Sequence, residues 1–374
     1  MKRKTSIFFL LAWNDYRIFQ GISRYAHEVG WQMDTRHFFL NLFPNDRSFQ
    51  GMIAMWHRDP KVNAYIRKKA KQVPTVILGT QNPRVDAPMV MPDNRAAGRL
   101  AAQHLYDLYH KNYAWFAGDL CLSGAERKSA FEEHLAELGF PCTDLSCGKA
   151  TFTAKAVLRK LKRVPKPVGV LARDDHDAAV LVELCKQAGL RTPEDVAVVG
   201  IGDLESLCAF SPIPVSSVSL NMDEIGYQAA AVLDLRLQNK FVPRITVIPA
   251  GNLTRRLSTG CLALTEPHVL SAVRTIDVRF AESLSMEDLA AAAGVSRRQL
   301  YILFKQEMRS SPHDYLLNVR LRHARNLITE NLLTLNEIAE RTGFNTPRSL
   351  NRLFHQRFGL APSKWAKIGQ PLSG

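Results

Sequence analysis

Short apolar runs alternate with amphipathic segments over the first two-thirds of the chain. Runs with the length of buried strands lie at 7–13, 51–56, 75–78, 113–117, 168–172 and 196–200. Apolar residues at helical spacing between them predict helices over 19–29, 61–71, 94–109, 124–138, 152–161, 177–188 and 223–238. Continuous apolar strands between amphipathic helices are typical of a parallel sheet covered on both faces. This pattern predicts an α/β fold for the front of the chain.

Polar and aromatic residues follow these strands, at the edge where parallel sheets bind ligands. The residues are Trp13, Asn14, Asp15, Trp56, His57, Asp174, Asp175 and Asp203. Carboxylates accept hydrogen bonds from sugar hydroxyls, and indole rings pack on the C–H face of a sugar ring, so a small polyhydroxylated ligand is predicted. Two alternatives stay open: Trp13 and Trp56 as core residues, and the acids at 174–177 as a helix cap with an acidic first turn. Consecutive residues at a helix start point in different directions, which argues against a metal site there.

The last hundred residues lose the strand pattern and contain an internal repeat with a shift of 49–50 residues. Ser285 and Thr334 each begin a capping box that opens a short helix. Each short helix ends at a glycine, Gly294 or Gly343, and a second helix with an apolar stripe follows. The offset is 49 before the glycine and 50 after it, which predicts a second turn one residue longer. This order is typical of helix-turn-helix motifs, here over 285–307 and 334–358, with an ordinary helical bundle as the alternative.

The charge distribution favours nucleic acid as a partner. The chain has 49 Lys and Arg against 35 Asp and Glu, a formal net charge of +14. From Ser296 onward there are 13 basic and 5 acidic residues, and they cluster where recognition helices would meet phosphates. The predicted DNA contacts are Arg297, Arg298, Tyr301 and Ile302 in the first motif, and Arg348, Ser349, Asn351 and Arg352 in the second. Arginine suits guanine and asparagine suits adenine in the major groove, whereas Ile302 offers apolar contact at most.

Several classes of protein are disfavoured. The six cysteines show neither a CxxC pair nor zinc-ligand spacing, and they fit a reducing compartment better than a disulfide framework. The apolar run near the start imitates a secretory signal but is about seven residues long and has no cleavage site. No run approaches the roughly 18 apolar residues that span a bilayer, and no nucleotide-binding or hydrolase motif occurs. We expect a cytoplasmic protein that is not an enzyme, with no cofactor, no metal and no membrane partner.

The front of the chain resembles the sensor domain of LacI/GalR repressors, which is similar to periplasmic sugar-binding proteins. The matching stretches are 90–94, 123–131, 173–175, 192–200 and 215–218, within a resemblance over about residues 5–258. The resemblance implies two lobes with parallel sheets and a ligand between them, and it adds Asp93 and Arg127 to the ligand contacts. Arg127 stands where the family arginine contacts the sugar. Gly202 stands where the family often has Asp, with Asp203 one position later, which leaves the effector open.

The tail resembles the AraC/XylS DNA-binding domain over about 267–368, including a connecting helix with Arg320, Ala324 and Leu327. A LacI-like sensor in front of such a tail resembles the xylose-regulator (XylR) type of AraC-group activator. The expected organisation is a two-lobed periplasmic-binding-protein-like α/β sensor at 1–258, a linker at 259–266 and an all-α domain with two helix-turn-helix motifs at 267–374. The resemblance implies a homodimeric, sequence-specific transcriptional regulator on double-stranded operator DNA, controlled by a monosaccharide such as xylose, with RNA polymerase as a further candidate partner. The alternative is a ligand-independent regulator whose α/β domain only dimerises.

Overall fold

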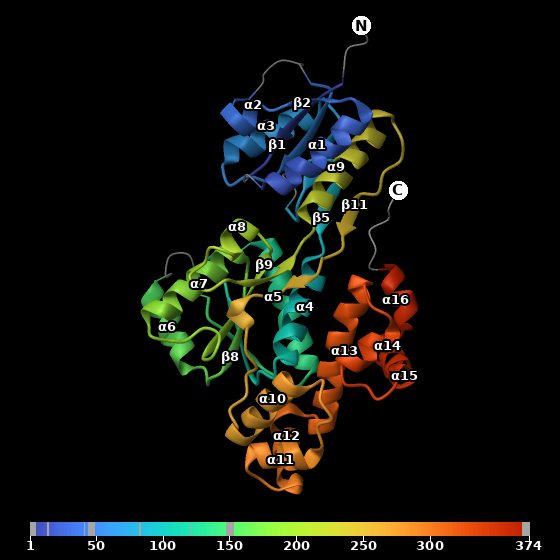
Figure 1. Cartoon of the computed structure of the whole chain (residues 1–374). Helices are drawn as coiled ribbons and strands as arrows, with labels where there is room; N and C mark the ends of the chain where they lie inside the picture. The colour runs from blue at the N-terminus through green and yellow to red at the C-terminus, as the bar shows by residue number, and fades with distance from the viewer. Residues whose placement is uncertain are drawn as a thin grey trace. The chain divides into compact units, whose positions relative to one another are not determined.

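The computed structural model of the chain describes residues 5–12, 15–40, 42–43, 49–81, 84–119, 121–146 and 153–368. The chain forms two compact units, Met1–Ala263 and Leu264–Gly374. The first is the predicted α/β part and the second is helical throughout the residues described (Figure 1).

The first lobe of the α/β unit is built on a six-stranded parallel sheet in the order β11-β5-β4-β3-β1-β2. Its strands are β1 (Ser6–Leu10), β2 (Gln32–Asp34), β3 (Gly51–Met55), β4 (Thr75–Leu78), β5 (Met89–Pro92) and β11 (Ile245–Ile248). Its helices are α1 (Tyr16–Val29), α2 (Arg36–Leu40), α3 (Pro60–Ala70) and α9 (Met222–Leu237). Successive residues of β1 point to opposite faces, so Phe8 and Leu10 enter one core while Ile7 and Phe9 enter the other.

The second lobe has a sheet in the order β12-β10-β9-β8-β6-β7, parallel except for β12. Its strands are β6 (Asn112–Phe116), β7 (Cys142–Asp144), β8 (Val168–Ala172), β9 (Val196–Gly202), β10 (Ser216–Ser219) and β12 (Leu253–Thr254). Its helices are α4 (Asn94–Asp107), α5 (Leu122–Glu137), α6 (Ala154–Arg163), α7 (Asp175–Gln187), α8 (Glu205–Cys208) and the 3-10 turn η1 (Leu257–Thr259). Apolar cores cover both faces of this sheet as well, which confirms the predicted fold class.

The chain passes between the two sheets three times, after β5, after β10 and after β11. These crossings explain why two elements late in the sequence complete the first lobe, α9 beside α1 and β11 beside β5 (Figure 1). The predicted strands and helices appear within a few residues of their expected bounds. The sequence pattern missed β2, β7, β12, α2 and α8, which are too short to show a period, and it also missed β5, β10 and the exposed edge strand β11.

The second unit consists of α10 (Pro267–Arg279), α11 (Met286–Ala293), α12 (Arg297–Met308), α13 (Pro312–Glu330), α14 (Leu335–Arg341), α15 (Pro347–Phe358) and α16 (Pro362–Ile368). Both capping boxes are present, at Ser285 with Asp288 and at Thr334 with Glu337. The predicted difference in turn length is also present. The N-cap Ser296 of α12 follows Gly294 by two residues, whereas the N-cap Thr346 of α15 follows Gly343 by three.

None of the described helices is long and apolar enough to cross a bilayer. The same residues contain no cluster of three His, Cys, Asp or Glu side chains placed to hold a metal ion.

Candidate functional site: the lobe junction and the DNA-binding helices

Arg17 joins the two lobes at the carboxyl ends of their sheets. Its guanidinium forms a two-pronged pair with Asp15, with Nε and Nη2 at 3.0 and 2.8 Å from the two carboxylate oxygens. Its Nη1 donates to the carbonyl oxygens of Gly202 and Asp203, both at 2.8 Å. Arg17 lies in the first turn of α1 and Gly202 ends β9, so these bonds cross from one lobe to the other. We call Asp15, Arg17, Asp175, Gly202 and Asp203 the lobe junction.

Asp175 and Asp203 are connected through Ser217. The Ser217 hydroxyl lies 2.5 Å from Oδ1 of Asp175 and accepts from the Asp203 N–H at 3.0 Å. Asp175 is 2% exposed and also accepts from the Leu204 N–H, and burial raises the pKa of its carboxyl group. Asp203 pairs with Arg256 at 2.8 Å and accepts from the Thr254 hydroxyl at 2.6 Å. Two of the predicted ligand residues are therefore held in one hydrogen-bonded group.

The backbone explains why residue 202 is a glycine. Gly202 has φ +131°, a conformation that side chains rarely adopt. A Cβ atom there would stand 3.0 Å from a carboxylate oxygen of Asp175. An aspartate at 202 would bring a second carboxylate against the buried carboxylate of Asp175. In this chain the acidic residue is Asp203, one position later.

Arg127 is buried and anchors the second lobe close to α4 and α7. Its Nε donates to Oδ1 of Asn94 at 2.9 Å, and its Nη1 donates to the Arg173 carbonyl at 2.7 Å. Burial lowers the pKa of its guanidinium, while the charge of Asp174 opposes that shift. Asp174 itself caps α7 and lies 3.1 Å from Nε of Arg173. The predicted contacts Arg127 and Asp174 are thus neighbours, and both already have partners within the protein.

The remaining predicted ligand residues are less closely joined. Asp93 caps α4 by accepting from the Ala96 N–H at 2.8 Å. The His57 backbone N–H donates to Oδ1 of Asn63 at 2.9 Å, and Trp56 beside it is half-buried at the end of β3. Trp13 and Asn14 lie outside the described residues.

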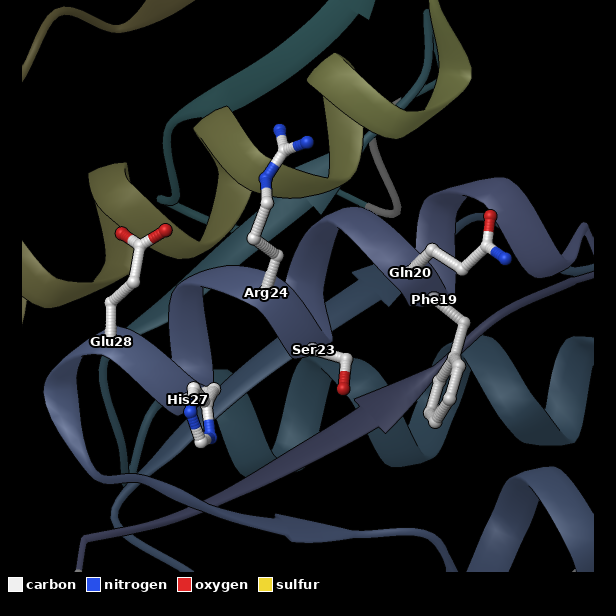
Figure 2. Close-up of a pocket in the computed structure, with 6 residues that line it drawn as sticks. All are labelled: Phe19, Gln20, Ser23, Arg24, His27 and Glu28. Carbon is white, nitrogen blue, oxygen red and sulfur yellow. The ribbon is translucent and has the colours of Figure 1, made fainter. Parts of the chain in front are cut away.

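A hollow of about 500 Å³ lies elsewhere in the first lobe, along α1. Figure 2 shows its six lining side chains, among them Ser23, Arg24, His27 and Glu28. Arg24 stacks on the Tyr227 ring at 4.6 Å, and the Tyr227 hydroxyl donates to Glu28, so this side of the hollow is fastened to α9. The hollow does not contain the predicted ligand residues.

The predicted DNA contacts lie on the outer faces of α12 and α15. Arg297, Arg298, Tyr301 and Ile302 are exposed on α12, while Arg348, Asn351 and Arg352 are exposed on α15 and Ser349 is half-buried. Arg297 pairs with Glu287 at 2.5 Å, and the Ser349 hydroxyl donates to the Thr346 carbonyl in the helix cap. The inner faces bury Leu300 and Phe304 in α12, and Leu350 and Phe354 in α15. The apolar stripes therefore leave the basic residues turned toward solvent.

Sequence reasoning missed Arg17, Ser217 and the pairing of Arg256 as parts of the junction. Arg17 offered one signal, since a basic residue two positions after Asp15 places opposite charges at a single strand end. Ser217 and Arg256 offered none, because their partners are 42 and 53 residues away in the chain.

Comparisons with known proteins agree with both units. A family model described as a periplasmic binding protein-like domain matches residues 102–259, and a helix-turn-helix domain model matches residues 289–368. The chain is 25% identical over 368 residues to the xylose operon regulatory protein of Haemophilus influenzae, covering 94% of each. The protein of that name from Escherichia coli K12 is 28% identical over 210 residues, 56% of this chain and 53% of the relative. A solved structure titled as the xylose-binding transcription activator xylR has a similar fold, with a TM-score of 0.59 and 23% sequence identity. The match covers 99% of this chain and 100% of the chain in that structure.

A two-lobed α/β sensor followed by two helix-turn-helix motifs defines a DNA-binding transcription regulator. The relatives above are regulators and not enzymes, as the sequence predicts for this chain. The chain thus combines a periplasmic binding protein-like domain with a helix-turn-helix domain, and it is similar over nearly its whole length to the xylose operon regulatory protein of Haemophilus influenzae.

Proposed function

We propose that the protein is a cytoplasmic, homodimeric regulator of transcription whose affinity for operator DNA depends on a monosaccharide, with a pentose such as xylose as the first candidate. The observation that carries the proposal is the lobe junction. Asp15, Asp175 and Asp203 come from three strand ends in two lobes and converge on Arg17 and its acceptors. Convergent carboxylates and a guanidinium provide the acceptors and donors that sugar hydroxyls require.

The proposed ligand acts through the contacts that already join the lobes. A sugar that binds one arrangement of the lobes better shifts the population toward it, by no more than its difference in affinity. Because this coupling is reciprocal, operator DNA changes the affinity for the sugar by the same factor. RNA polymerase is a candidate partner in activation.

The effector is tested by thermal unfolding of the full chain with a panel of pentoses and hexoses. An effector at about 100 times its Kd stabilises the sensor by about 2.7 kcal/mol. Asp203→Asn keeps the size of the side chain and removes its charge, and Arg127→Ala removes the buried guanidinium. We expect both variants to lose the stabilisation, and a cooperative unfolding transition without sugar checks that each variant is folded. No stabilisation by any sugar, in a protein that unfolds cooperatively, rejects the sugar.

DNA reading is tested on sequences selected from a random duplex library by the full chain. Arg298→Ala and Arg352→Ala should each cost about 1–3 kcal/mol on the selected sequence if these arginines read bases. An equal loss on random DNA would reassign them to phosphate contacts.

The internal pairing of Arg17 favours one alternative, a regulator that needs no ligand. In that case Arg17 itself holds the lobes together, and the α/β unit serves for dimerisation alone. The two functions differ in one measurement, because only the first gives a sugar-dependent change in DNA affinity.

A further inference from the structure

Helix α6 of the second lobe carries a basic face that neither the lobe junction nor the helix-turn-helix motifs use. Its ten residues contain five basic and no acidic side chains. Val157 and Leu161 are fully buried in the core of the lobe, so the opposite side of the helix faces solvent.

The cations on this outer face are not paired with any carboxylate among the described residues. Lys155, Arg159, Lys162 and Arg163 are exposed, and none makes an ion pair with a residue that the structure describes. Lys160 differs, because its Nζ turns back to donate to the Ser146 carbonyl at 2.6 Å. We call the four exposed cations the α6 face.

Basic residues on helices α4 and α5, which cover the other face of the same sheet, behave differently. Arg95 pairs with Glu133 and Arg99 pairs with Glu137, and Lys128 pairs with Asp144. These three cations therefore each have a carboxylate partner close by. The α6 face leaves its charges unbalanced, and mutual repulsion between cations that are three and four residues apart costs stability. An anionic partner would relieve that repulsion.

The charge balance of the whole unit agrees with such a partner. Residues 1–263 contain 34 basic and 25 acidic residues, an excess of nine, whereas residues 264–374 contain 15 and 10, an excess of five. Most of the positive charge that predicts a polyanionic partner therefore lies in the sensor unit and not in the helix-turn-helix unit.

The geometry of the α6 face fits a phosphate backbone. Lys155, Arg159 and Lys162 are four and three residues apart, so they line one side of the helix over about 10 Å. With Thr153 and Leu158 they border a hollow of about 610 Å³. Duplex DNA carries one charge per about 1.7 Å of its axis, so a row of this length meets several phosphates. Protein interfaces centre on aromatic and apolar anchors, and helix α6 itself contains no aromatic residue, which favours DNA over an acidic protein.

We propose that the α6 face is a second DNA-contact surface, which binds the phosphate backbone of a duplex without reading its bases. The inference rests on the proposed function, since it assumes a protein that works on DNA. It adds a sequence-independent contact from the sensor unit to the contacts of the helix-turn-helix motifs.

The test measures how binding of the full chain to a 60-bp random-sequence duplex depends on salt, by fluorescence anisotropy between 50 and 300 mM KCl. The variant Lys155→Gln/Arg159→Gln/Lys162→Gln removes three cations and keeps good helix formers. Each lost phosphate contact reduces the slope of log K against log salt by about 0.9, so we expect a slope shallower by about two to three. At 50 mM KCl the Kd should rise at least tenfold. A slope equal to that of the unmodified chain overturns the proposal.

Two controls separate the α6 face from net charge and from the helix-turn-helix motifs. Lys68→Gln/Lys186→Gln/Lys240→Gln removes the same charge at three scattered exposed sites, and its slope should change by less than one. Equal slopes in both triple variants overturn the proposal, because net charge would then explain the binding. In the background Arg298→Ala/Arg352→Ala the α6 substitutions should still make the remaining slope shallower. If the Arg298→Ala/Arg352→Ala variant binds DNA like the unmodified chain, the proposed role of these arginines is rejected, and the measurement on α6 still tests the α6 face. If this variant does not bind DNA at all, the α6 face is not a DNA contact.

Discussion

Replacing Arg17 with methionine removes the guanidinium that crosses the lobe junction and keeps a side chain of similar length. Four hydrogen bonds are lost, two to Asp15 and two to the carbonyl oxygens of Gly202 and Asp203. The Asp15 carboxylate is 8% exposed and would be left buried without its counter-charge. Removing one partner of a buried pair costs about 3–5 kcal/mol. Since Arg17 is 28% exposed, we expect the low end, about 3 kcal/mol.

The assay is thermal unfolding followed by tryptophan fluorescence, because four of the five tryptophans lie in the sensor unit. A loss of about 3 kcal/mol corresponds to roughly 6–10 °C in the midpoint of a transition of this size. Asp15→Asn keeps the helix cap and removes the charge, so the double variant Asp15→Asn/Arg17→Met should lose less than the sum of the single losses. A coupling free energy of about 1.5 kcal/mol or more is expected between the two positions.

Arg58→Met is the matched control. Arg58 also makes a contact between the lobes, with Asp119 at 2.9 Å, but its side chain is 82% exposed. Exposed ion pairs contribute about 0–1 kcal/mol, so this variant should shift the midpoint little. If Arg17→Met and Arg58→Met shift the midpoint equally, or if the cycle with Asp15 shows no coupling, the reasoning about the junction is refuted.

The two turn glycines and a buried histidine give further predictions. Gly294→Ala should cost about 1 kcal/mol, because φ is +70° but the space around the added Cβ is open. Gly343→Ala should cost about 3 kcal/mol, since its Cβ would stand 2.7 Å from the Phe280 carbonyl oxygen, and equal losses in urea unfolding would contradict this difference. Burial lowers the pKa of His104 from 6.5 to about 4, so the unfolded chain takes up its proton first as the pH falls. Sensor stability should therefore decrease between pH 6.5 and 4, and His104→Gln should flatten that decrease in melts across this range.

Local pattern was sufficient for the repeating elements of the fold. The strand at 75–78 and the helix-turn-helix units can be predicted from residues that are close in sequence. The reason is that the spacing of apolar residues, the capping boxes and the glycine turns all depend on a few consecutive positions. The one-residue difference between the two turns was visible in the repeat itself. Even the exposure of Arg298 and Arg352 followed from their helical phase relative to Leu300 and Leu350.

The chain on its own therefore determined the class of each unit, the order of the long elements and which residue types gather at the strand ends. Only the tertiary structure decided that Arg17 of the first lobe pairs with Asp15 and reaches β9, and that Asp203 faces Arg256. It also decided that the four exposed cations of α6 form no ion pair with a residue that the structure describes, whereas Arg95 and Arg99 of α4 do. The physical reason is the distance in sequence over which each interaction acts. Helix and turn preferences depend on residues that are close in sequence. Hydrogen bonds and ion pairs between single side chains depend on which strand ends come together when the chain crosses between the two sheets.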